Sequence, residues 1–255
     1  MKYIESKSNK LVKDWKKLHT VKGRRQQAAY LIEGHHLLEE AINSKCPISD
    51  IMVVDPSLLT FDLDDDWQVF IINPDIAKEI RQTETDQGIF AVIQSQEHDY
   101  QLEPLLGNGQ RFLLMDRIQD PGNLGTIIRS GDAAGFDAII VGQGSVDIYN
   151  SKVIRSTQGS LWHIPIINGN LRTIIPQLQA GGIIVYGAAL ELDSINYRDI
   201  DRNQALAFVI GNEGQGLAKE LMSLADHLVH IPMPGKAESL NAAIAASILM
   251  FHSLL

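Results

Sequence analysis

The chain has 255 residues, of which 45% are apolar and 21% charged, and its formal net charge is −9. This is the composition of a soluble globular protein large enough for one large or two modest domains, and no apolar run reaches the roughly 18 residues that a membrane span needs. The N-terminus lacks the apolar core of a signal peptide, the eight histidines lack metal-ligand spacing, and one cysteine excludes an internal disulfide, so we expect a cytoplasmic protein without a metal.

The first 25 residues are strongly basic. Nine lysines and arginines stand against Glu5 and Asp14, a balance of +7, which leaves −16 on the remaining residues because the whole chain carries −9. Such a basic arm can contact a polyanion, since neutralising phosphates supplies affinity that does not depend on sequence. A solvated, frayed terminus explains the same charge equally well. The candidate contacts are Lys10, Lys13, Lys17, Lys22, Arg24 and Arg25.

Strand and helix patterns alternate through residues 1–95. Apolar residues recur at helical intervals over 8–20, with lysines on the other faces. The later elements are predicted as strand then helix over 30–44, a strand over 48–56, strand then helix over 67–83, and a strand over 88–94. This alternation indicates a small α/β domain. Residues 96–110 are polar, without a clear period, and are interpreted as a linker.

Residues 111–255 alternate again. Strands are predicted over 111–118, 137–142, 181–190, 205–211 and 227–233, and helices over 123–135, 150–159, 171–180, 217–225 and from about 239. Apolar strands separated by helices indicate a parallel sheet covered on both faces. Ligands of such sheets bind at the carboxyl ends of the strands. Three of these ends are polar and glycine-rich, at 119–126, 211–216 and 233–241.

The first polar strand end lies within DRIQDPGNLGTIIRS, residues 116–130. Asn123 is expected to cap a helix that begins at Leu124. Arg129 then falls inside an apolar helix, where a permanent charge requires a partner or a water-filled cleft. The structural alternative is an arginine that extends from the helix edge to solvent.

The other two strand ends offer further polar side chains. In FVIGNEGQGL (208–217), glycines permit a close approach of the backbone to a ligand, and Glu213 lies at a helix entrance, which the helix dipole favours even without a function. In IPMPGKAESLNAAIAAS (231–247), Ser239 begins an apolar helix and Asn241 lies two residues inside it. The structural alternative for Ser239 is a simple N-cap.

The segments around the three polar strand ends resemble the motifs of a known family. DPGNLGTIIRSGDAAGFDAIIV, IGNEGQG and IPMPGKAESLNAAIAAS resemble, in order and spacing, the three motifs of the SpoU (TrmH-like) branch of the SPOUT RNA methyltransferases. The match covers 111–255 and includes YNSKVIRSTQGSLWHIPI between the first two motifs. SKSNKLVKDWKKL, YLIEGHHLLEEA and TETDQGIFAVI look like the substrate-binding domain of the ribosomal-RNA members.

The resemblance implies an α/β fold of two domains. Residues 111–255 would form the knotted (trefoil) parallel-sheet SPOUT methyltransferase domain, and 1–95 a small N-terminal α/β substrate-binding domain for RNA. The chain over about 208–241 would hold S-adenosylmethionine in a bent shape, and the family acts as a homodimer with its site beside the interface. The implied cofactor-binding residues are Gly211, Asn212, Gly216, Ile231, Met233 and Leu240.

The resemblance also implies methyl transfer to a ribose 2′-hydroxyl of RNA. The hydroxyl is a poor nucleophile, so its proton must leave as the methyl group arrives. Arg129 matches the family's catalytic arginine, and we expect it to orient the hydroxyl and stabilise developing negative charge. A phosphate oxygen or Glu213 could take the proton. Asn123, Ser239 and Asn241 would hold the arginine, the ribose and the loops in register, and Arg155 joins the basic residues as an RNA contact.

Other readings remain open at the level of sequence. A non-catalytic RNA-binding module of this fold is disfavoured by the complete set of five matching residues. A nucleotide-dependent oxidoreductase predicts G-x-G-x-x-G after the first strand of a βαβ unit, and none is present. Within the family, transfer RNA is an alternative substrate, but the N-terminal domain favours ribosomal RNA.

Overall fold

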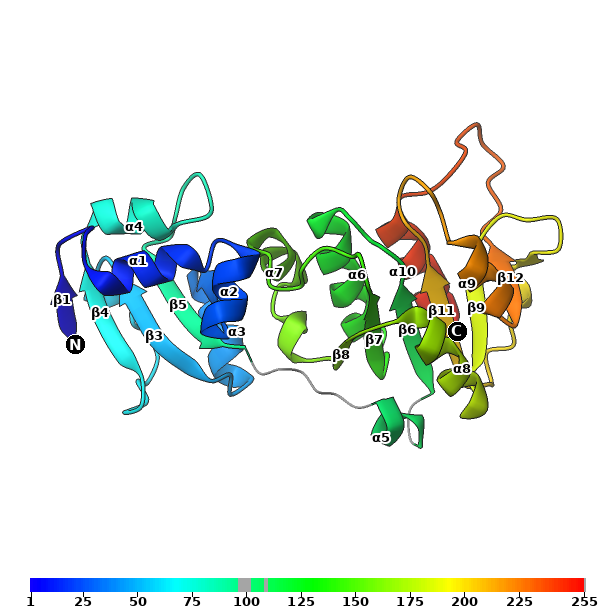
Figure 1. The fold of residues 1–255 in the computed structure, drawn as a ribbon, viewed down its shortest axis with the longest axis horizontal. Coiled ribbons are helices and arrows are strands. Elements are labelled where there is room, and N and C mark those ends of the chain that lie inside the picture. The colour runs from blue at the N-terminus through cyan, green and yellow to red at the C-terminus, as the bar shows by residue number, and fades with distance from the viewer. Residues whose placement is uncertain (96–101, 108–109, 255) are drawn as a thin grey trace. The chain divides into compact units, whose positions relative to one another are not determined.

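The computed structural model describes residues 1–95, 102–107 and 110–254 of the chain (Figure 1). Its contacts divide the chain into two units. The described part of the first unit is residues 1–95 with Tyr149–Trp162, and that of the second is 102–107, 110–148 and 163–254. The predicted linker, 96–110, lies largely outside the described residues, although Leu102–Leu106 forms the short helix α5.

The first unit is built on a mixed five-stranded sheet. Its strands are β1 (Lys2–Ile4), β2 (Ala29–Glu33), β3 (Ile48–Val53), β4 (Gln68–Ile72) and β5 (Ile89–Gln94). The spatial order is β1-β4-β3-β5-β2. Strand β4 pairs parallel with β1 and β3, whereas β5 pairs antiparallel with β2 and β3.

The basic N-terminal residues are part of this folded unit. The helices are α1 (Lys10–Lys17), α2 (Val21–Gln27), α3 (His35–Asn43), α4 (Pro74–Ile80) and α7 (Ser151–Thr157), with a 3₁₀ turn η1 (Pro56–Leu58). Val12 and Trp15 of α1 are buried against the sheet, and the Trp15 indole donates a hydrogen bond to Asp50 at 2.8 Å. Since β1, α1 and α2 all lie within the first 27 residues, this segment is neither an arm nor a frayed terminus.

One segment groups differently from the predicted domains. Tyr149–Trp162, predicted inside the domain 111–255, packs with the first unit. The ring of Tyr149 stacks on Tyr30 of β2 with centroids 4.3 Å apart, and the indole of Trp162 donates to the Tyr30 hydroxyl at 2.8 Å. Burial raises the pKa of Tyr30 well above its ordinary value. The segment that carries Arg155 is therefore tied to the first unit.

The second unit contains a seven-stranded sheet. Its strands are β6 (Arg111–Met115), β7 (Ala138–Gly142), β8 (Ile166–Gly169), β9 (Ile184–Ala188), β10 (Ile195–Asn196), β11 (Leu206–Ile210) and β12 (His227–His230). They lie in the order β10-β12-β9-β11-β6-β7-β8, and every neighbouring pair is parallel. The predicted parallel sheet is therefore confirmed. The sequence pattern did not predict the short strands β8 and β10. Each of the other five strands of this sheet lies within its predicted range and is shorter than predicted.

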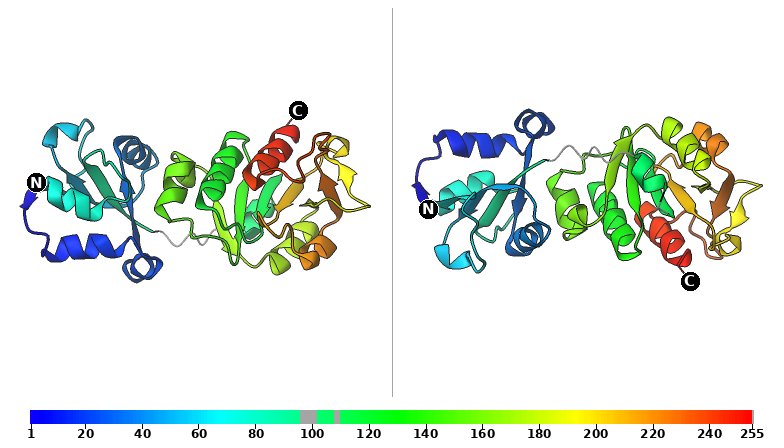
Figure 2. Two further views of the ribbon diagram at one scale, coloured as in Figure 1. Left: turned by 90° about the horizontal axis from the view of Figure 1, so that it is seen from above. Right: turned by 90° about the horizontal axis from the view of Figure 1, so that it is seen from below.

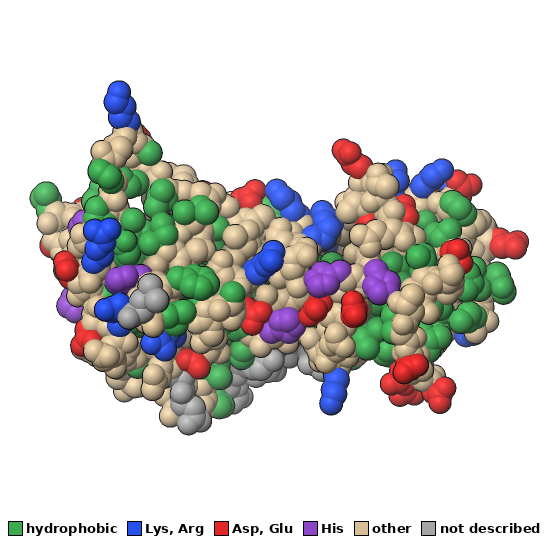
Figure 3. All heavy atoms as spheres, turned by 180° about the vertical axis from the view of Figure 1, so that it is seen from behind, with side chains coloured by type: hydrophobic (Ala, Val, Ile, Leu, Met, Phe, Trp, Pro, Cys, Tyr) green, Lys and Arg blue, Asp and Glu red, His purple; other side chains and the backbone are tan. Residues whose placement is uncertain are grey.

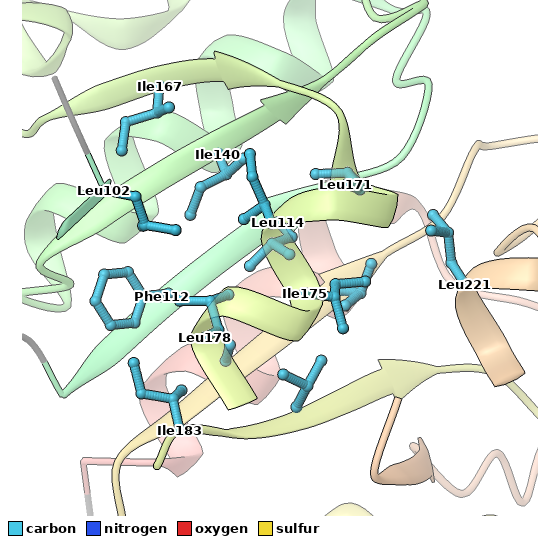
Figure 4. Packing of buried hydrophobic residues seen from close by; sticks show 14 of the residues in the cluster. Leu102, Phe112, Leu114, Ile140, Ile167, Leu171, Ile175, Leu178, Ile183 and Leu221 are labelled. Carbon is cyan, nitrogen blue, oxygen red and sulfur yellow. The ribbon is translucent and has the colours of Figure 1, made fainter. Parts of the chain in front are cut away.

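Helices cover both faces of this sheet, as Figure 2 shows. On one face lie α6 (Pro121–Ala133) and α10 (Ala242–His252), and on the other α8 (Leu171–Ala180) and α9 (Lys219–Leu224). This unit also contains the 3₁₀ turn η3 (Tyr197–Asp199), whereas the 3₁₀ turn η2 (Ser160–Trp162) belongs to the first unit. Figure 4 shows α8 packing through Ile175 and Leu178 onto the buried core, together with Phe112 and Leu114 of β6. Among the described residues no helix is both long and apolar enough to cross a membrane.

Candidate functional site

The three polar strand ends predicted from the sequence meet at one edge of the seven-stranded sheet. They follow β6, β11 and β12, and β11 lies between β6 and β9 while β12 lies on the far side of β9. Two cavities adjoin there. The larger, here called the polar cavity, measures about 680 Å³, and the smaller, called the apolar cavity, about 380 Å³. Both are lined by Asn212, Glu213, Gly214, Ser239, Leu240 and Ala242.

Asn123 lines the polar cavity, but it does not cap its helix. Helix α6 begins at Pro121, and the N-cap is Asp120, whose side chain accepts from the Asn123 backbone at 2.8 Å. A proline at the first helical position has the required φ and no orphan N–H, which explains the earlier start. The prediction of a cap at Asn123 was therefore wrong, and its side chain is available for other contacts.

Asn241 is the residue that caps the last helix. Its side-chain oxygen accepts from the backbone N–H groups of Ala243 at 2.9 Å and Ile244 at 3.3 Å. Its amide nitrogen donates to Asn123 Oδ1 at 2.9 Å. Ser239 lies before α10 and lines both cavities, so the predictions that Ser239 begins the helix and that Asn241 lies inside it were wrong.

Glu213 completes a chain of polar contacts with Asn123 and Asn241. Its Oε1 accepts from Asn123 Nδ2 at 3.0 Å and from the Asp120 backbone at 3.1 Å, and its Oε2 accepts from the Gln119 backbone at 3.1 Å. The Glu213 carboxylate therefore lies at the N-terminus of α6, not at the N-terminus of α9. Burial alone would raise the pKa of Glu213, but these three donors outweigh it and the pKa is lowered. The carboxylate is therefore held in its ionised form.

We expect the Glu213→Gln variant to lose a pH-dependent part of the stability. A carboxyl whose pKa is lowered on folding stabilises the native state above its unfolded pKa, near 4.5, and loses that contribution as the pH falls through the folded value. The wild type should therefore exceed Glu213→Gln in urea midpoint by a constant amount between about pH 6 and pH 8, and the gap should close below about pH 4. A gap that widened on acidification would contradict the hydrogen-bonded carboxylate.

Arg129 is set apart from the other four predicted catalytic residues. It lies on α6 six residues after Asn123, its side chain is exposed, and it lines neither cavity. Within the part of the chain that the structure describes, its guanidinium has no hydrogen bond or ion pair. A single chain therefore brings together Asn123, Glu213, Ser239 and Asn241 but not Arg129.

The apolar cavity contains all six predicted cofactor-binding residues: Gly211, Asn212, Gly216, Ile231, Met233 and Leu240. Its remaining walls come from β12 and the segment after it, from the end of β9, from α9 and from α10, and include Ala188, Leu190, Glu191, Met222, His230, Glu238 and Leu249. A cavity of a few hundred Å³ with an apolar wall and a few polar groups suits a small organic ligand. These residues therefore fit an adenosine-containing cofactor such as S-adenosylmethionine.

The glycine at 211 is required by the protein itself. A Cβ there would lie 2.2 Å from the backbone nitrogen of Leu217 and 2.3 Å from the carbonyl carbon of Gly216. The turn is closed by paired backbone hydrogen bonds between Asn212 and Gly216, and Gly216 has a φ of 66°. Gly211 thus permits the chain to fold back on itself, in addition to lining the cavity.

Sequence reasoning missed a clamp that holds this turn. Arg117 follows β6 with a φ of 54°, which is uncommon for a residue other than glycine. Its guanidinium donates to both oxygens of the buried Asp116 at 2.9 Å and to Gln215 at 2.8 Å, and its carbonyl accepts from Asn212 at 2.8 Å. The Ala218 backbone also donates to Asp116 at 3.1 Å. No sequence signal distinguishes Arg117, because its partners in the turn lie about a hundred positions away.

The end of β9 was missed for a different reason. Ala188, Ala189 and Leu190 are apolar, so they do not stand out among the polar strand ends, although they line the apolar cavity. The rule that ligands bind at the carboxyl ends of parallel strands would have found them.

The predicted RNA contacts all belong to the first unit. Lys10, Lys13, Lys17, Lys22 and Arg25 lie in its first 27 residues, and Lys17 forms an ion pair with Asp14 at 2.7 Å. Arg24 is different: it is only 7% exposed, and its guanidinium donates to the Leu18 carbonyl at 2.9 Å. Arg24 therefore has a structural role.

On the face shown in Figure 3, lysines and arginines are interspersed with acidic side chains. Among the described residues no group of three or more His, Cys, Asp or Glu could hold a metal ion.

Comparisons with known proteins agree with this geometry. A family model described as the SpoU rRNA Methylase family matches residues 110–251, and one described as the MRM3-like substrate binding domain matches residues 9–91. The chain is 43% identical to the Bacillus subtilis 23S rRNA (guanosine(2553)-2′-O)-methyltransferase RlmP over 252 residues, which is 99% of each chain.

Solved structures show the same fold. The AdoMet-bound rRNA methyltransferase from Sinorhizobium meliloti aligns with a TM-score of 0.87 and 31% identity over 99% of this chain and 97% of that one. The SpoU methyltransferase AviRb from Streptomyces viridochromogenes, in complex with AdoMet, aligns with a TM-score of 0.83 and 27% identity over 96% of this chain and 97% of that one. With three motifs around one site and a family match over more than half its length, the chain belongs to the SpoU branch of the SPOUT methyltransferases.

Proposed function

We propose that this protein transfers a methyl group from S-adenosylmethionine to a ribose 2′-hydroxyl of ribosomal RNA. The observation that carries the proposal is the pair of adjoining cavities: an apolar one that fits the cofactor and a polar one lined by Asn123, Glu213, Ser239 and Asn241. Because the two cavities share a wall, ligands bound in them would lie next to each other, as group transfer requires. The AdoMet-bound Sinorhizobium meliloti and Streptomyces viridochromogenes structures support the choice of cofactor.

In this mechanism the cofactor, when bound, supplies an electrophilic methyl group. The protein's own residues place the ribose. Asn241, capping α10, orients the Asn123 amide, and Asn123 in turn is bonded to Glu213, so that the loops after β6, β11 and β12 are fixed relative to one another. Arg129 lies outside both cavities of its own chain, so in this mechanism it acts from the partner chain of a dimer, where it orients the 2′-hydroxyl and stabilises the negative charge that develops on its oxygen.

The structure favours one of the two proton acceptors considered from the sequence. Both oxygens of the Glu213 carboxylate are already engaged within the protein, by three donors at the start of α6. We therefore assign Glu213 the role of holding the N-terminus of α6 and assign the proton to a phosphate oxygen of the RNA.

The proposed substrate is 23S ribosomal RNA, at the guanosine that corresponds to position 2553 for the Bacillus subtilis relative. The support is 43% identity over 99% of both chains and the match of residues 9–91 to a substrate-binding domain. A ribosomal RNA substrate also agrees with the cytoplasmic location expected from the single cysteine. Mapping 2′-O-methyl groups in ribosomal and transfer RNA, with and without the gene, tests the assignment. Loss of a methyl group from a transfer RNA alone would overturn it.

We expect exposed lysines of the first 27 residues to supply salt-dependent affinity for RNA. Replacing Lys10, Lys13 and Lys22 by glutamine should weaken binding and reduce the slope of log K against log salt by about 2–3, since each phosphate contact contributes nearly one unit. Lys45, Lys78 and Lys219 are also exposed and serve as a control triple with the same change of charge. If both triple variants lost the same RNA affinity, the cause would be the general change of net charge and not the loss of specific phosphate contacts.

We further propose that the protein acts as a homodimer through the outer face of α10. This helix is apolar all round, a pattern typical of a helix that is fully covered, yet Ile244 is 50% and Phe251 45% exposed. Since α10 packs against α6, which carries Arg129, the proposed interface lies beside the catalytic arginine.

The trefoil knot that the family resemblance implies also remains a prediction for this chain.

Phe251→Asp should therefore shift the protein from dimer to monomer in sedimentation velocity, because a buried carboxylate without a partner opposes association. Leu192, which is fully exposed on a loop, provides the control, and Leu192→Asp should remain dimeric. A wild type that sediments as a monomer at all concentrations would exclude the proposed interface.

A further inference from the structure

The apolar cavity contains a half-buried polar side chain, His230, whose role the family motifs do not assign. His230 is the last residue of β12, directly before the motif residue Ile231, and it lines the cavity. It is half-buried, whereas the carboxylates of Glu191 and Glu238 on the same cavity are exposed. Its ring nitrogens therefore have a restricted set of partners.

One ring nitrogen of His230 is committed to Ser194. The distance from Nδ1 to the Ser194 hydroxyl is 2.9 Å. That hydroxyl lies 2.7 Å from the carbonyl oxygen of Glu191, which can only accept, so its single proton is directed there. Nδ1 must then supply the hydrogen for the contact with Ser194.

The tautomer follows from this arrangement. A neutral imidazole carries one N–H, so with Nδ1 protonated the lone pair of Nε2 is an acceptor. Nε2 has no hydrogen bond within the described ranges of the chain. Strand pairing fixes the ring's surroundings further, because β10, just after Ser194, pairs in parallel with β12 and places Asn196 opposite His230.

The side chain of Asn212, which is also half-buried in this cavity, already forms hydrogen bonds within the protein. Asn212 accepts through Oδ1 from the backbones of Gly214 and Gln215 at 3.0 Å each, and its amide donates to the Arg117 carbonyl. Glu213 is directed to α6. Nε2 of His230 is thus the half-buried acceptor that remains for a ligand.

We propose that His230 is a cofactor-binding residue, whose Nε2 accepts a hydrogen bond from an N–H or O–H of the adenosine moiety of S-adenosylmethionine. The adenosine half suits this position, since the neighbouring Val229, Ile231 and Met233 form an apolar wall, whereas the exposed carboxylates suit the cationic half. Ser194 is a positioning residue that keeps the ring in the accepting tautomer. The inference rests on the proposed cofactor.

Two substitutions separate cofactor binding from a purely structural contact. His230→Asn places an amide nitrogen near the position of Nδ1, so it retains the bond to Ser194 but has no atom at Nε2. His230→Gln places an amide oxygen near Nε2 and restores the acceptor. Titration calorimetry with S-adenosylhomocysteine should show affinity about 3- to 10-fold weaker for His230→Asn, the range of one lost hydrogen bond, and within about 2-fold of wild type for His230→Gln.

A second ligand tests whether the group that donates to His230 Nε2 belongs to the adenosine part of the cofactor. 5′-Methylthioadenosine lacks the amino-acid part, and His230→Asn should weaken its binding by the same factor. Wild-type affinity of His230→Asn for S-adenosylhomocysteine, equal weakening by Gln and Asn, or unchanged binding of 5′-methylthioadenosine would each overturn the proposal. If the wild type itself binds no S-adenosylhomocysteine, the proposed function fails instead.

Nitrogen NMR of the unaltered protein, labelled at histidine, gives a test that needs no variant. We expect the neutral His230 ring to carry its proton on Nδ1 and its Nε2 signal to shift when S-adenosylhomocysteine is added. A proton on Nε2, or a signal that does not respond to the ligand, would contradict the assignment.

Discussion

Arg129→Ala should lower the rate of RNA methylation by about 100- to 1,000-fold while leaving the affinity for S-adenosylhomocysteine unchanged. The rate falls because removing one group that stabilises charge developing in the transition state has an effect of this size. Cofactor affinity stays because Arg129 does not line the apolar cavity. The measurements are single-turnover methyl transfer to RNA and calorimetry with S-adenosylhomocysteine.

Two further variants control this experiment. Arg129→Lys keeps the charge but not the planar fork, so we expect it to recover only part of the rate. Arg172 is also exposed, on α8, where it pairs with Glu220 at 2.7 Å, and Arg172→Ala should methylate as the wild type does. An Arg129→Ala protein with near-wild-type turnover and intact cofactor binding would show that Arg129 is not catalytic.

Gly211→Ala should reduce both cofactor binding and methylation, by about 100-fold in rate. The new methyl group would lie 2.2 Å from the Leu217 backbone, a separation that real structures do not show, so the turn 212–216 must move. This turn carries Asn212, Glu213 and Gly216 into the cavities, and displacements of about 1 Å at a site can lower rates by about 100-fold.

A matched glycine distinguishes this effect from a general loss of flexibility. Gly235 lies on the segment between β12 and α10, a Cβ added there would meet no heavy atom within 4 Å, and its φ is not positive. Gly235→Ala should therefore bind S-adenosylhomocysteine as the wild type does. If Gly211→Ala bound the ligand normally, the turn would be adaptable and the cavity wall would not depend on it. We expect Gly211→Ala also to lose about 1–3 kcal/mol of stability from overpacking, measurable by urea denaturation.

Much of the fold follows from local pattern. The period-2 and period-3.6 spacing of apolar residues located most of the strands and helices. An element that buries one face has apolar residues at the period of that face, so the pattern is visible in the sequence. Element starts were less predictable. Both errors that touch the site arose at helix N-termini, where Asp120 and Asn241 compete as caps with Asn123 and Ser239, and only the backbone path decides which side chain reaches the free N–H groups.

The candidate site divides in the same way. The sequence alone determined an α/β protein with a parallel sheet, three polar strand ends and, through the family motifs, the residues from Gly211 to Leu240 that line the apolar cavity, since these are properties of short contiguous segments. Tertiary structure decided which distant groups meet: Arg117 with Gln215, Glu213 with the start of α6, and His230 with Ser194. It also placed Arg24 in the core and Arg129 outside both cavities. These outcomes depend on the order of strands in the sheet, which brings together positions far apart in sequence and leaves no local periodic signal.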